Sequence, residues 1–554
     1  MIQFRSALSA AVLAFGLAVA GGAAASPQPQ VEAPRLIVTI VVDQFSADLF
    51  SQYRSQFTGG LRRMADQGRI HVNGYQTHGL TETCPGHSTI LTGMHPTETG
   101  IPANDWINPE TGQEVYCLAA PQNTLAHGQN TDNGPVGPGN LRVDTLGDWL
   151  KAASADSRVL AVSGKDRGAM NLAGHQGQAF WFTDGFGLTT YVEPGRTAED
   201  KLAPVAAFNT AFRAEMAAGP PVWNNRYESC RALAADWTIR GQTFHSAVPP
   251  TEPKFDTSPA LDEQTLKAAI WLLDSEQLGR RGVTDMLGVS LSATDRIGHG
   301  FGTQGPEMCE QMFRLDAALG VFLDRLEAVP GGALVVLTAD HGGSDFPERL
   351  AAHGYPQAHR ADVTGIAAVN AALRAQFGLD ADPLQQGGSG LMVADAQRRS
   401  LPDPLRTQVA EAAVEMLRPL ADVAFAETRD RLLAEPMPVS TAQPEMLSLR
   451  ERMRLSAVAV HSPDILFAFA PNVVPGGRVG GSIGGHGTPW EYDRRVPILF
   501  WWPGADAQER FLPIRTIDIA PTLAHVIGLE TPKLEGRCID LNAFGTAPCE
   551  TPAP

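Results

Sequence analysis

The sequence predicts an α/β protein in which a doubly wound, mostly parallel sheet is flanked by helices. Residues 36–42 form a continuous apolar, β-branched run, which is typical of a strand buried on both faces. Similar short runs recur at 158–163, 286–291, 333–338, 465–470 and 497–502. A helical period precedes one of them, with an apolar face made of Met312, Leu315, Leu319, Phe322, Leu323 and Leu326. Sheets of this class bind ligands beyond the carboxyl ends of their strands.

The chain has 554 residues, enough for one large α/β domain with insertions or for two domains. We expect one domain over residues 35–545, without an internal repeat. Residues 171–255 are rich in aromatic residues, Gly and Pro, and residues 345–460 hold loops and a helical section near 409–433. Both segments interrupt the alternation, and we interpret them as insertions over the active site.

Residues 1–25 have the pattern of a secretory signal peptide. Arg5 is the only charge, an apolar run follows, and Ala23-Ala24-Ala25 fits a small-residue cleavage site. A membrane anchor is the alternative, but the apolar run is short for a bilayer. The Pro-rich residues 26–34 are expected to form a flexible lead-in. We therefore expect a periplasmic or secreted protein with no transmembrane segment in its mature chain.

The six cysteines of an exported chain can form disulfides. Cys538 and Cys549 are close in sequence and flank a turn that contains Gly and Pro, so this is the pair that we expect. The pairing of the other four stays open, because connectivity cannot be read from spacing.

The formal net charge of −17 disfavours a protein that binds nucleic acid as a scaffold, because such binding needs clustered Lys and Arg. Any anion-binding site in so acidic a protein needs local positive charge, from metals or a few placed cations.

Metal-ligand residue types follow several predicted strand ends. Asp340 and His341 lie between the strand at 333–338 and two glycines, where a turn lets both side chains face one ion. Asp295 and His299 are spaced to share one side of a helical turn. Taken alone, Asp43 would be a helix cap and a His in a Gly-rich loop would be a weak signal. The full set is Asp43, Asp295, His299, Asp340, His341 and His486.

Three Asp and three His fit two sites of three ligands each. These ligands suit zinc better than manganese or iron. Three protein ligands leave a position open in each site, which is typical of catalytic metals, whereas structural zinc sites are closed.

Thr83 lies two residues before Pro85, and Pro is favoured in the first turn of a helix. Thr83 and Cys84 are therefore expected at a helix N-terminus, where free amides and the helix dipole favour an anion. Thr83 is either a nucleophile activated by a base or metal, or only a helix cap. Cys84 is the other candidate nucleophile, although thiols of exported proteins are more often bonded or buried.

Three further side chains are candidates for contact with a phosphoryl group. Asn104 can donate from its amide, Arg167 can bind oxygens in a bidentate manner, and Lys165 can act as a point charge. Lys165 and Arg167 alternate after the strand at 158–163 and so point in the same general direction. Ordinary alternatives are a turn residue for Asn104 and solvated surface positions for both cations.

Taken in order, these motifs resemble the alkaline phosphatase superfamily, in the branch related to type I phosphodiesterases and nucleotide pyrophosphatases. They are most similar to the periplasmic alkaline phosphatases that use a threonine nucleophile. The resemblance covers roughly residues 35–530 and rests on Val-Val-Asp43, Thr83-Cys-Pro-Gly-His87, Ala-Asn104-Asp-Trp, Lys165-Asp-Arg167, Asp295-Arg-Ile-Gly-His299, Thr-Ala-Asp340-His341 and Gly-Gly-His486-Gly-Thr-Pro.

The resemblance implies two zinc ions and a phosphothreonine intermediate on Thr83. It assigns one zinc, which also binds the Thr83 oxygen, to Asp43, Asp340 and His341. It assigns the second, which stabilises the leaving oxygen and activates water, to Asp295, His299 and His486. Asn104, Lys165 and Arg167 would stabilise the non-bridging phosphoryl oxygens.

Within this family the Lys165–Arg167 pair favours a phosphate monoesterase that acts on small phosphate esters. The family's diesterases characteristically lack such a pair, and a monoester carries one more negative charge. A phosphodiesterase or nucleotide pyrophosphatase is the alternative. A sulfatase is disfavoured because Pro directly follows Cys84, whereas the sulfatase motif resembles Cys-x-Pro-x-Arg. A metal-binding protein without catalysis would lack part of the set, and no part is missing. No feature of the sequence specifies an oligomeric state.

Overall fold

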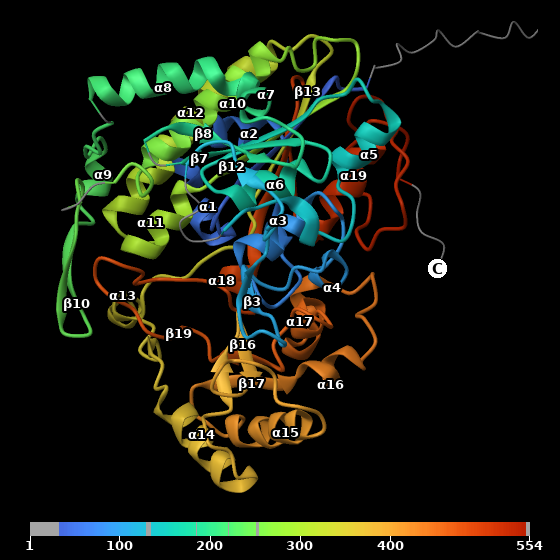
Figure 1. Cartoon of the computed structure of the whole chain (residues 1–554). Coiled ribbons are helices and arrows are strands. Elements are labelled where there is room, and N and C mark those ends of the chain that lie inside the picture. Colours follow the sequence, from blue (N-terminus) through green and yellow to red (C-terminus); the bar gives the residue numbers. More distant parts are fainter. Residues whose placement is uncertain (1–32, 129–133, 184, 220, 251–253, 550–554) are drawn as a thin grey trace, which may run out of the picture.

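A computed structural model describes residues 33–128, 134–183, 185–219, 221–250 and 254–549 (Figure 1). The expected signal peptide at 1–25 and most of the expected lead-in at 26–34 lie outside the described residues. No helix within the described ranges is long and apolar enough to cross a membrane.

A ten-stranded sheet forms the centre of the molecule, in the order β21-β2-β20-β13-β1-β12-β6-β7-β8, with β22 pairing with β2. Its strands are β1 (Leu36–Val42), β2 (Arg69–Tyr75), β6 (Val159–Ser163), β7 (Gln178–Thr183), β8 (Gly187–Thr189), β12 (Asp285–Leu291), β13 (Ala333–Thr338), β20 (Arg495–Trp501), β21 (Gln508–Arg510) and β22 (Ile514–Arg515). The neighbours β13, β1, β12, β6 and β7 run parallel. Only β20 and β8 pair antiparallel with their neighbours in the sheet. The predicted fold class, with a mostly parallel sheet, is confirmed.

Helices cover both faces of the sheet (Figure 1). Alternate side chains of β1 enter two separate cores, because successive residues of a strand point to opposite faces. Val38 and Ile40 pack in the core beneath α1 (Ala47–Tyr53), α2 (Gly60–Gln67), α10 (Pro259–Ser275) and α12 (Pro306–Glu327). Ile37 and Val41 pack in the core beneath α3 (Thr83–Ile90), α5 (Leu146–Ala153), α6 (Asp166–Ala173) and α19 (Ile519–Val526).

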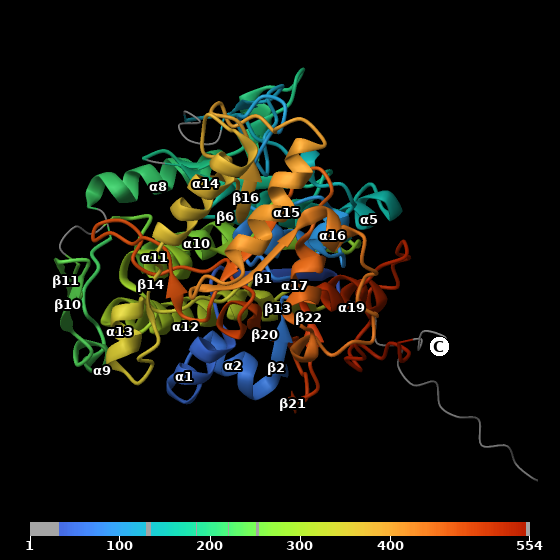
Figure 2. The same cartoon turned by 90° about the horizontal axis from the view of Figure 1, so that it is seen from below.

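A smaller unit, shown in yellow and orange at the bottom of Figure 1 and turned toward the viewer in Figure 2, has its own apolar core. Its four-stranded antiparallel sheet has the order β15-β16-β18-β17. The unit contains α14 (Thr364–Phe377), β15 (Leu384–Gln386), β16 (Gly390–Val393), α15 (Leu405–Leu417), β17 (Val423–Thr428), α16 (Arg429–Leu433), α17 (Leu449–Ser456) and β18 (Ile465–Phe469).

Three expectations are corrected. The apolar run at 465–470 forms β18 and belongs to this smaller sheet, because the pattern of a buried strand does not specify which sheet buries it. The helical section near 409–433 is interrupted by strand β17, between α15 and α16. The range 171–255, expected as an insertion, includes the end of α6 and the strands β7 and β8 of the central sheet.

The remainder of that range holds β9 (Tyr191–Val192), α7 (Ala198–Leu202), α8 (Ala206–Ala218), α9 (Glu228–Arg231), β10 (Ala235–Ile239) and β11 (Gln242–Ser246). The helices α8 and α9 and strand β10 lie along one side of the molecule, in green in Figure 1.

All six cysteines are paired. The expected pair Cys538–Cys549 is confirmed. Cys230–Cys309 links α9 to α12, and Cys84–Cys117 links the start of α3 to the residue that follows β4 (Glu114–Tyr116). Because Cys84 is in a disulfide, it is not the nucleophile in this oxidised form.

Helix α12 offers a test of how much its buried face contributes to stability. Phe322 is fully buried in the core beneath the sheet, whereas its neighbour Val321 is 60% exposed. We expect Phe322→Ala to lower the free energy of unfolding by about 3–5 kcal/mol, because the lost contacts leave a cavity. Val321→Ala, the control on the same helix, should change it by less than about 0.5 kcal/mol. Denaturant unfolding monitored by circular dichroism measures both, and equal effects would contradict this packing.

Candidate active site

The predicted ligands gather at the carboxyl ends of neighbouring parallel strands. Asp43 directly follows β1, and Asp340 comes two residues after the end of β13. Asp295 lies in the first turn of α11 (Ala293–Phe301), which begins two residues after β12. Lys165 follows β6 and is the N-cap of α6. Because β13, β1, β12 and β6 are adjacent, the topology brings these four residues to one edge of the sheet.

Asp43, Asp340 and His341 form the first cluster and are all fully buried. Nδ1 of His341 is within hydrogen-bonding distance of the Gly342 carbonyl, at 2.8 Å, which leaves Nε2 to face the carboxylates. This Nε2 lies 3.5 Å from Oδ1 of Asp43 and 3.5 Å from Oδ2 of Asp340. Among the described residues, neither Oδ1 of Asp43 nor this Nε2 has a hydrogen-bond partner. Buried, convergent ligand atoms of this kind fit a metal ion.

Asp295, His299 and His486 form the second cluster. The Nε2 atoms of His299 and His486 are 3.2 Å apart, and each lies 3.3 Å from Oδ1 of Asp295. Ligands of a tetrahedral zinc ion lie about 3.3 Å apart, because Zn–N and Zn–O bonds are about 2.0–2.1 Å long. Each histidine holds its Nδ1 against a backbone carbonyl, of Gly484 for His299 and of Thr81 for His486. The three ligand atoms therefore fit zinc. The two backbone carbonyls hold the imidazole rings in the orientation that turns Nε2 toward the metal position.

The two clusters adjoin each other. The His341 and His486 rings stack with their centroids 3.7 Å apart. The Lys165 ammonium donates to Oδ2 of Asp43 at 2.6 Å and to Oδ2 of Asp295 at 2.5 Å, one carboxylate from each cluster. Lys165 therefore lies between the clusters and offsets part of their negative charge.

Burial sets the protonation of these groups. Burial raises the pKa of Asp43 well above its usual value, and the like charges of Asp295 and Asp340 add to this. Burial alone would also raise the pKa of Asp295, but Lys165 and His299 outweigh it and hold that pKa well below the usual value. Burial lowers the pKa of His341 to about 3, which favours the neutral imidazole that binds metals. Three carboxylates in one dry site thus demand more positive charge than one lysine provides.

Thr83 is the first residue of α3 and is 1% exposed. His87, one turn further along the helix, places Nδ1 3.0 Å from the Thr83 carbonyl oxygen and 3.0 Å from Oδ2 of Asp340. The helix comes this close because residue 86 is glycine, whose added Cβ would lie 2.2 Å from the Asp340 carbonyl oxygen. The helix start thus contacts the first cluster, and the preceding Thr81 carbonyl contacts His486 of the second.

Asn104 is held on three sides. Its backbone N–H donates to Oε2 of Glu82 at 2.7 Å, and its carbonyl accepts from the Cys117 N–H at 2.8 Å. Its side-chain oxygen accepts from the Cys84 N–H at 2.8 Å. This bond orients the side chain so that the amide NH₂ group is left for another acceptor beside Thr83.

Arg167 lies in the first turn of α6, two residues beyond Lys165. Burial lowers the pKa of its guanidinium, but the nearby Tyr116, Asp166 and Asp43 raise it more, so it stays charged. The hydroxyl of Tyr116 lies 3.5 Å from its Nη1 atom.

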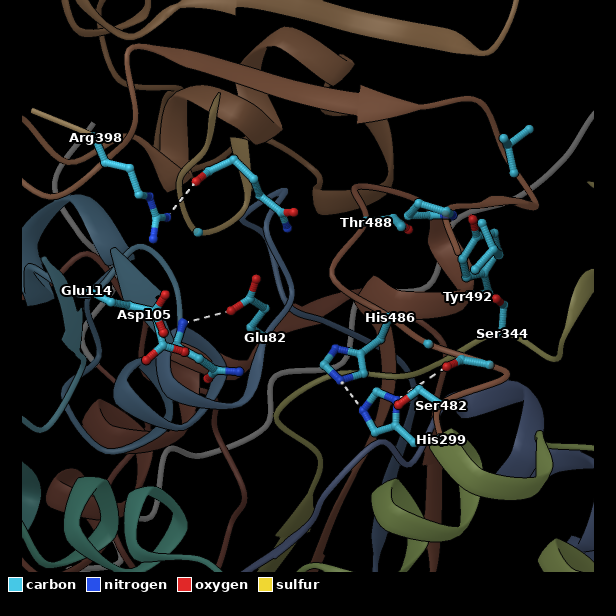
Figure 3. A pocket seen from close by; sticks show the side chains of 18 residues that line it. Glu82, Asp105, Glu114, His299, Ser344, Arg398, Ser482, His486, Thr488 and Tyr492 are labelled. Atoms are coloured by element: carbon cyan, nitrogen blue, oxygen red, sulfur yellow. Dashed lines mark hydrogen bonds between the residues drawn. The ribbon is translucent and has the colours of Figure 1, made fainter. Parts of the chain in front are cut away.

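A cleft of about 640 Å³ opens onto the second cluster (Figure 3). His299 and His486 lie at its centre, with Glu82, Asp105 and Glu114 on one wall and Ser344 and Tyr492 on the other. Residues of the smaller unit, including Gln386, Gly388 and Arg398, also line the cleft. Burial and the charges of Glu114 and Glu82 raise the pKa of Asp105 to about 6. The cleft therefore combines polar and charged side chains with free space directly beside the second cluster.

Several residues that support this site were not predicted from the sequence. His87 could have been found, since it lies four residues after Thr83 and so on the same helix face. Gln44, whose N–H donates to Oδ1 of Asp340, and Tyr116 lie on segments with no comparable spacing signal. Glu82 is the residue directly before α3, a position that does not by itself indicate a contact with Asn104.

The chain is similar to several known proteins. Residues 37–360 match the family described as type I phosphodiesterase / nucleotide pyrophosphatase. The alkaline phosphatase PhoK of Sphingomonas sp is 39% identical over 523 residues, 92% of this chain and 91% of PhoK. The alkaline phosphatase PhoD of Zymomonas mobilis is 35% identical over 532 residues, 93% of this chain and 89% of PhoD.

A crystal structure of the alkaline phosphatase PafA superposes with a TM-score of 0.78 at 27% identity, covering 92% of this chain and 99% of PafA. The prediction of a phosphoester hydrolase of the alkaline phosphatase type is confirmed. The chain belongs to the type I phosphodiesterase / nucleotide pyrophosphatase family of the alkaline phosphatase superfamily, together with the PhoK-like and PafA-like alkaline phosphatases.

Proposed function

We propose that the protein is an alkaline phosphatase that hydrolyses small phosphate monoesters through a phosphothreonine on Thr83. The contact of one helix start with both ligand clusters carries this proposal. His87 links the Thr83 turn to Asp340, and the Thr81 carbonyl links the same turn to His486. A hydroxyl at the N-terminus of a helix, beside two clusters that fit divalent ions, has the activation that a threonine nucleophile needs.

Two zinc ions are the proposed cofactors, one held by Asp43, Asp340 and His341 and the other by Asp295, His299 and His486. Bound there, two such ions supply positive charge for the attacking and leaving oxygens of an in-line displacement. The separations of 3.2–3.3 Å in the second cluster support zinc, because a larger ion with more ligands would spread them.

In the proposed reaction, Oγ1 of Thr83 attacks phosphorus and loses its proton as the bond to the leaving alcohol breaks. The alcohol leaves with a proton, and the phosphoryl group stays on Thr83. Water then cleaves the phosphothreonine, which releases inorganic phosphate and restores the hydroxyl. The N-terminus of α3 favours the negative charge that collects beside Thr83 during both steps.

Asn104, Lys165 and Arg167 are the proposed contacts for the non-bridging oxygens. The side-chain oxygen of Asn104 is already bonded to the Cys84 N–H, so its NH₂ group is the end available to the substrate. Nearby acidic groups keep the pKa of Arg167 above its usual value, so its guanidinium stays charged. The ammonium of Lys165 lies between the clusters and adds positive charge close to where the phosphoryl group would bind. Hydrogen bonds in such a dry site stabilise developing charge strongly.

The cation pair supports a monoesterase over the alternative, a phosphodiesterase or nucleotide pyrophosphatase. The relatives that match most of the chain bear the name alkaline phosphatase, although the family description names diesterases. One solved PafA variant carries substitutions of a threonine, an asparagine, a lysine and an arginine, the residue types and chain order of the four proposed here. The three disulfides support the proposed periplasmic or secreted location, because structural disulfides persist in oxidising compartments.

Removal of the nucleophile tests the central step. Thr83→Ala should lower kcat for p-nitrophenyl phosphate by at least about a thousandfold, because the covalent intermediate cannot form. Thr83→Ser keeps a hydroxyl and should retain most of the rate. Mass spectrometry of acid-quenched protein should find phosphate on residue 83 in the wild type and in the serine variant. An unchanged rate in Thr83→Ala would overturn the proposal.

Metal analysis tests the two clusters separately. His299→Ala and Asp340→Ala should each lower the zinc content of purified protein by about one ion of two, because each removes a ligand from a different three-ligand site. His353→Ala replaces an exposed histidine outside both clusters and should leave the zinc content unchanged. Plasma emission spectrometry measures the content, and wild-type zinc content in both ligand variants would contradict the assignment.

Substrate selectivity tests the cations. Replacing Lys165 and Arg167 together with alanine should lower kcat/KM for a monoester by orders of magnitude while largely sparing a diester. Because Lys165 also contacts two proposed ligands, Arg167→Ala alone is the cleaner variant. It should lower monoester kcat/KM by about 100-fold or more, the usual effect of losing one transition-state donor. Equal losses on p-nitrophenyl phosphate and bis-p-nitrophenyl phosphate would reject the monoesterase assignment in favour of the alternative.

A further inference from the structure

The Arg167 side chain needs support from outside its own helix. Arginine has several rotatable bonds, so an unsupported guanidinium samples many directions and loses entropy when a phosphoryl group fixes it. Its partner at the guanidinium end is the Tyr116 hydroxyl, 3.5 Å from Nη1. Tyr116 is 5% exposed and comes from a different segment, at the end of β4.

The direction of the hydrogen bonds is fixed by the third member of the group. The Tyr116 hydroxyl donates to Oδ1 of Asp166 at 2.7 Å. The tyrosine proton therefore points to Asp166, and the lone pairs of the hydroxyl oxygen face Nη1 of Arg167. The same Oδ1 atom accepts the backbone N–H of Arg167 at 2.7 Å. Asp166 thus holds the tyrosine in the orientation that receives the arginine.

The environment of Tyr116 favours the protonated phenol. Burial raises the pKa of Tyr116 well above its usual value, and the charge of Asp166 raises it further. The hydroxyl therefore remains able to donate to Asp166 while it accepts from Arg167.

The position of Tyr116 is tied covalently to the nucleophile. The next residue, Cys117, is in a disulfide with Cys84, which directly follows Thr83. The Cys117 N–H also donates to the Asn104 carbonyl, and the Asn104 side chain accepts from the Cys84 N–H. These links tie the backbone beside Tyr116 to the start of α3. The arginine partner is therefore set relative to Thr83 and does not depend on α6 alone.

We propose that Tyr116 is a positioning residue that, held by Asp166 and by the Cys84–Cys117 disulfide, aims Arg167 at the extra negative charge of a phosphate monoester. The inference rests on the proposed function of Arg167. Tyr116 acts through the arginine and does not touch the reacting atoms. Loss of the Tyr116 hydroxyl should therefore lower kcat/KM for monoesters, which need Arg167, much more than kcat/KM for diesters.

A double-mutant cycle between Tyr116→Phe and Arg167→Ala tests the coupling, with kcat/KM measured for p-nitrophenyl phosphate and bis-p-nitrophenyl phosphate. Tyr116→Phe removes one hydroxyl and keeps the ring, so the fold should be retained. It should lower monoester kcat/KM by about tenfold, the effect of one hydrogen bond to a charged group, and diester kcat/KM by less than about twofold. In the Arg167→Ala protein the same change should have no further effect on monoesters. Tyr191→Phe, at another buried tyrosine, is the matched control and should leave both rates unchanged.

Zinc content and thermal midpoint, measured on every variant, separate this role from a general loss of structure. A tenfold monoester loss that persists in the Arg167→Ala background would overturn the positioning role, and so would equal losses on both substrates. A large effect of Arg167→Ala with none from Tyr116→Phe would reject the inference alone. If Arg167→Ala spares monoester hydrolysis, the proposed function of the arginine fails, and the inference fails with it.

Discussion

The carboxylates of Asp43, Asp295 and Asp340 are buried together at the ends of three adjacent parallel strands. The other groups of the site offset the repulsion among these three negative charges. Like charges in a dry site raise one another's pKa unless positive charge is brought in. Lys165 bridges two of the carboxylates, and His87 approaches the third. The orphaned carboxylate and imidazole atoms that remain are the reason why the two clusters fit divalent ions.

The arrangement also explains why the candidate nucleophile lies where it does. His87 and the Thr81 carbonyl, which hold the clusters in shape, belong to the segment that begins α3. A shift of this helix would therefore disturb a ligand of each cluster. The carboxylates, the helix start and the strand ends form one packed assembly, in which few side chains can change without affecting a neighbour.

Much of this arrangement could be predicted from the sequence, because its determinants are local. Continuous apolar runs identified β1, β12 and β13, and residues just beyond them were expected at one edge of the sheet. The structure brings the six predicted ligands and Lys165 together at this edge, and it bonds Asn104 to the start of α3. Arg167 lies beside Tyr116 and Asp166. Strand β2 was missed because its sequence includes His71 and Asn73. The run at 465–470 was expected in the central sheet but lies in the smaller one. Long-range packing decides with which strands a strand pairs. Tyr116 and Glu82 could not be found for the same reason, as each acts through a residue distant in sequence.

The chain leaves the central fold for the smaller unit and re-enters the central fold close to where it left. Ser344, just past His341, pairs in an isolated bridge with Gly485, just before His486. The chain between them is therefore an insertion whose two ends lie side by side, next to the stacked His341 and His486 rings. Segments with adjoining ends can be lengthened, shortened or exchanged without re-threading the host fold. This insertion supplies one wall of the cleft. Changes within it can therefore alter which alcohol groups fit the cleft, while the strand ends and the ligands on them stay unchanged.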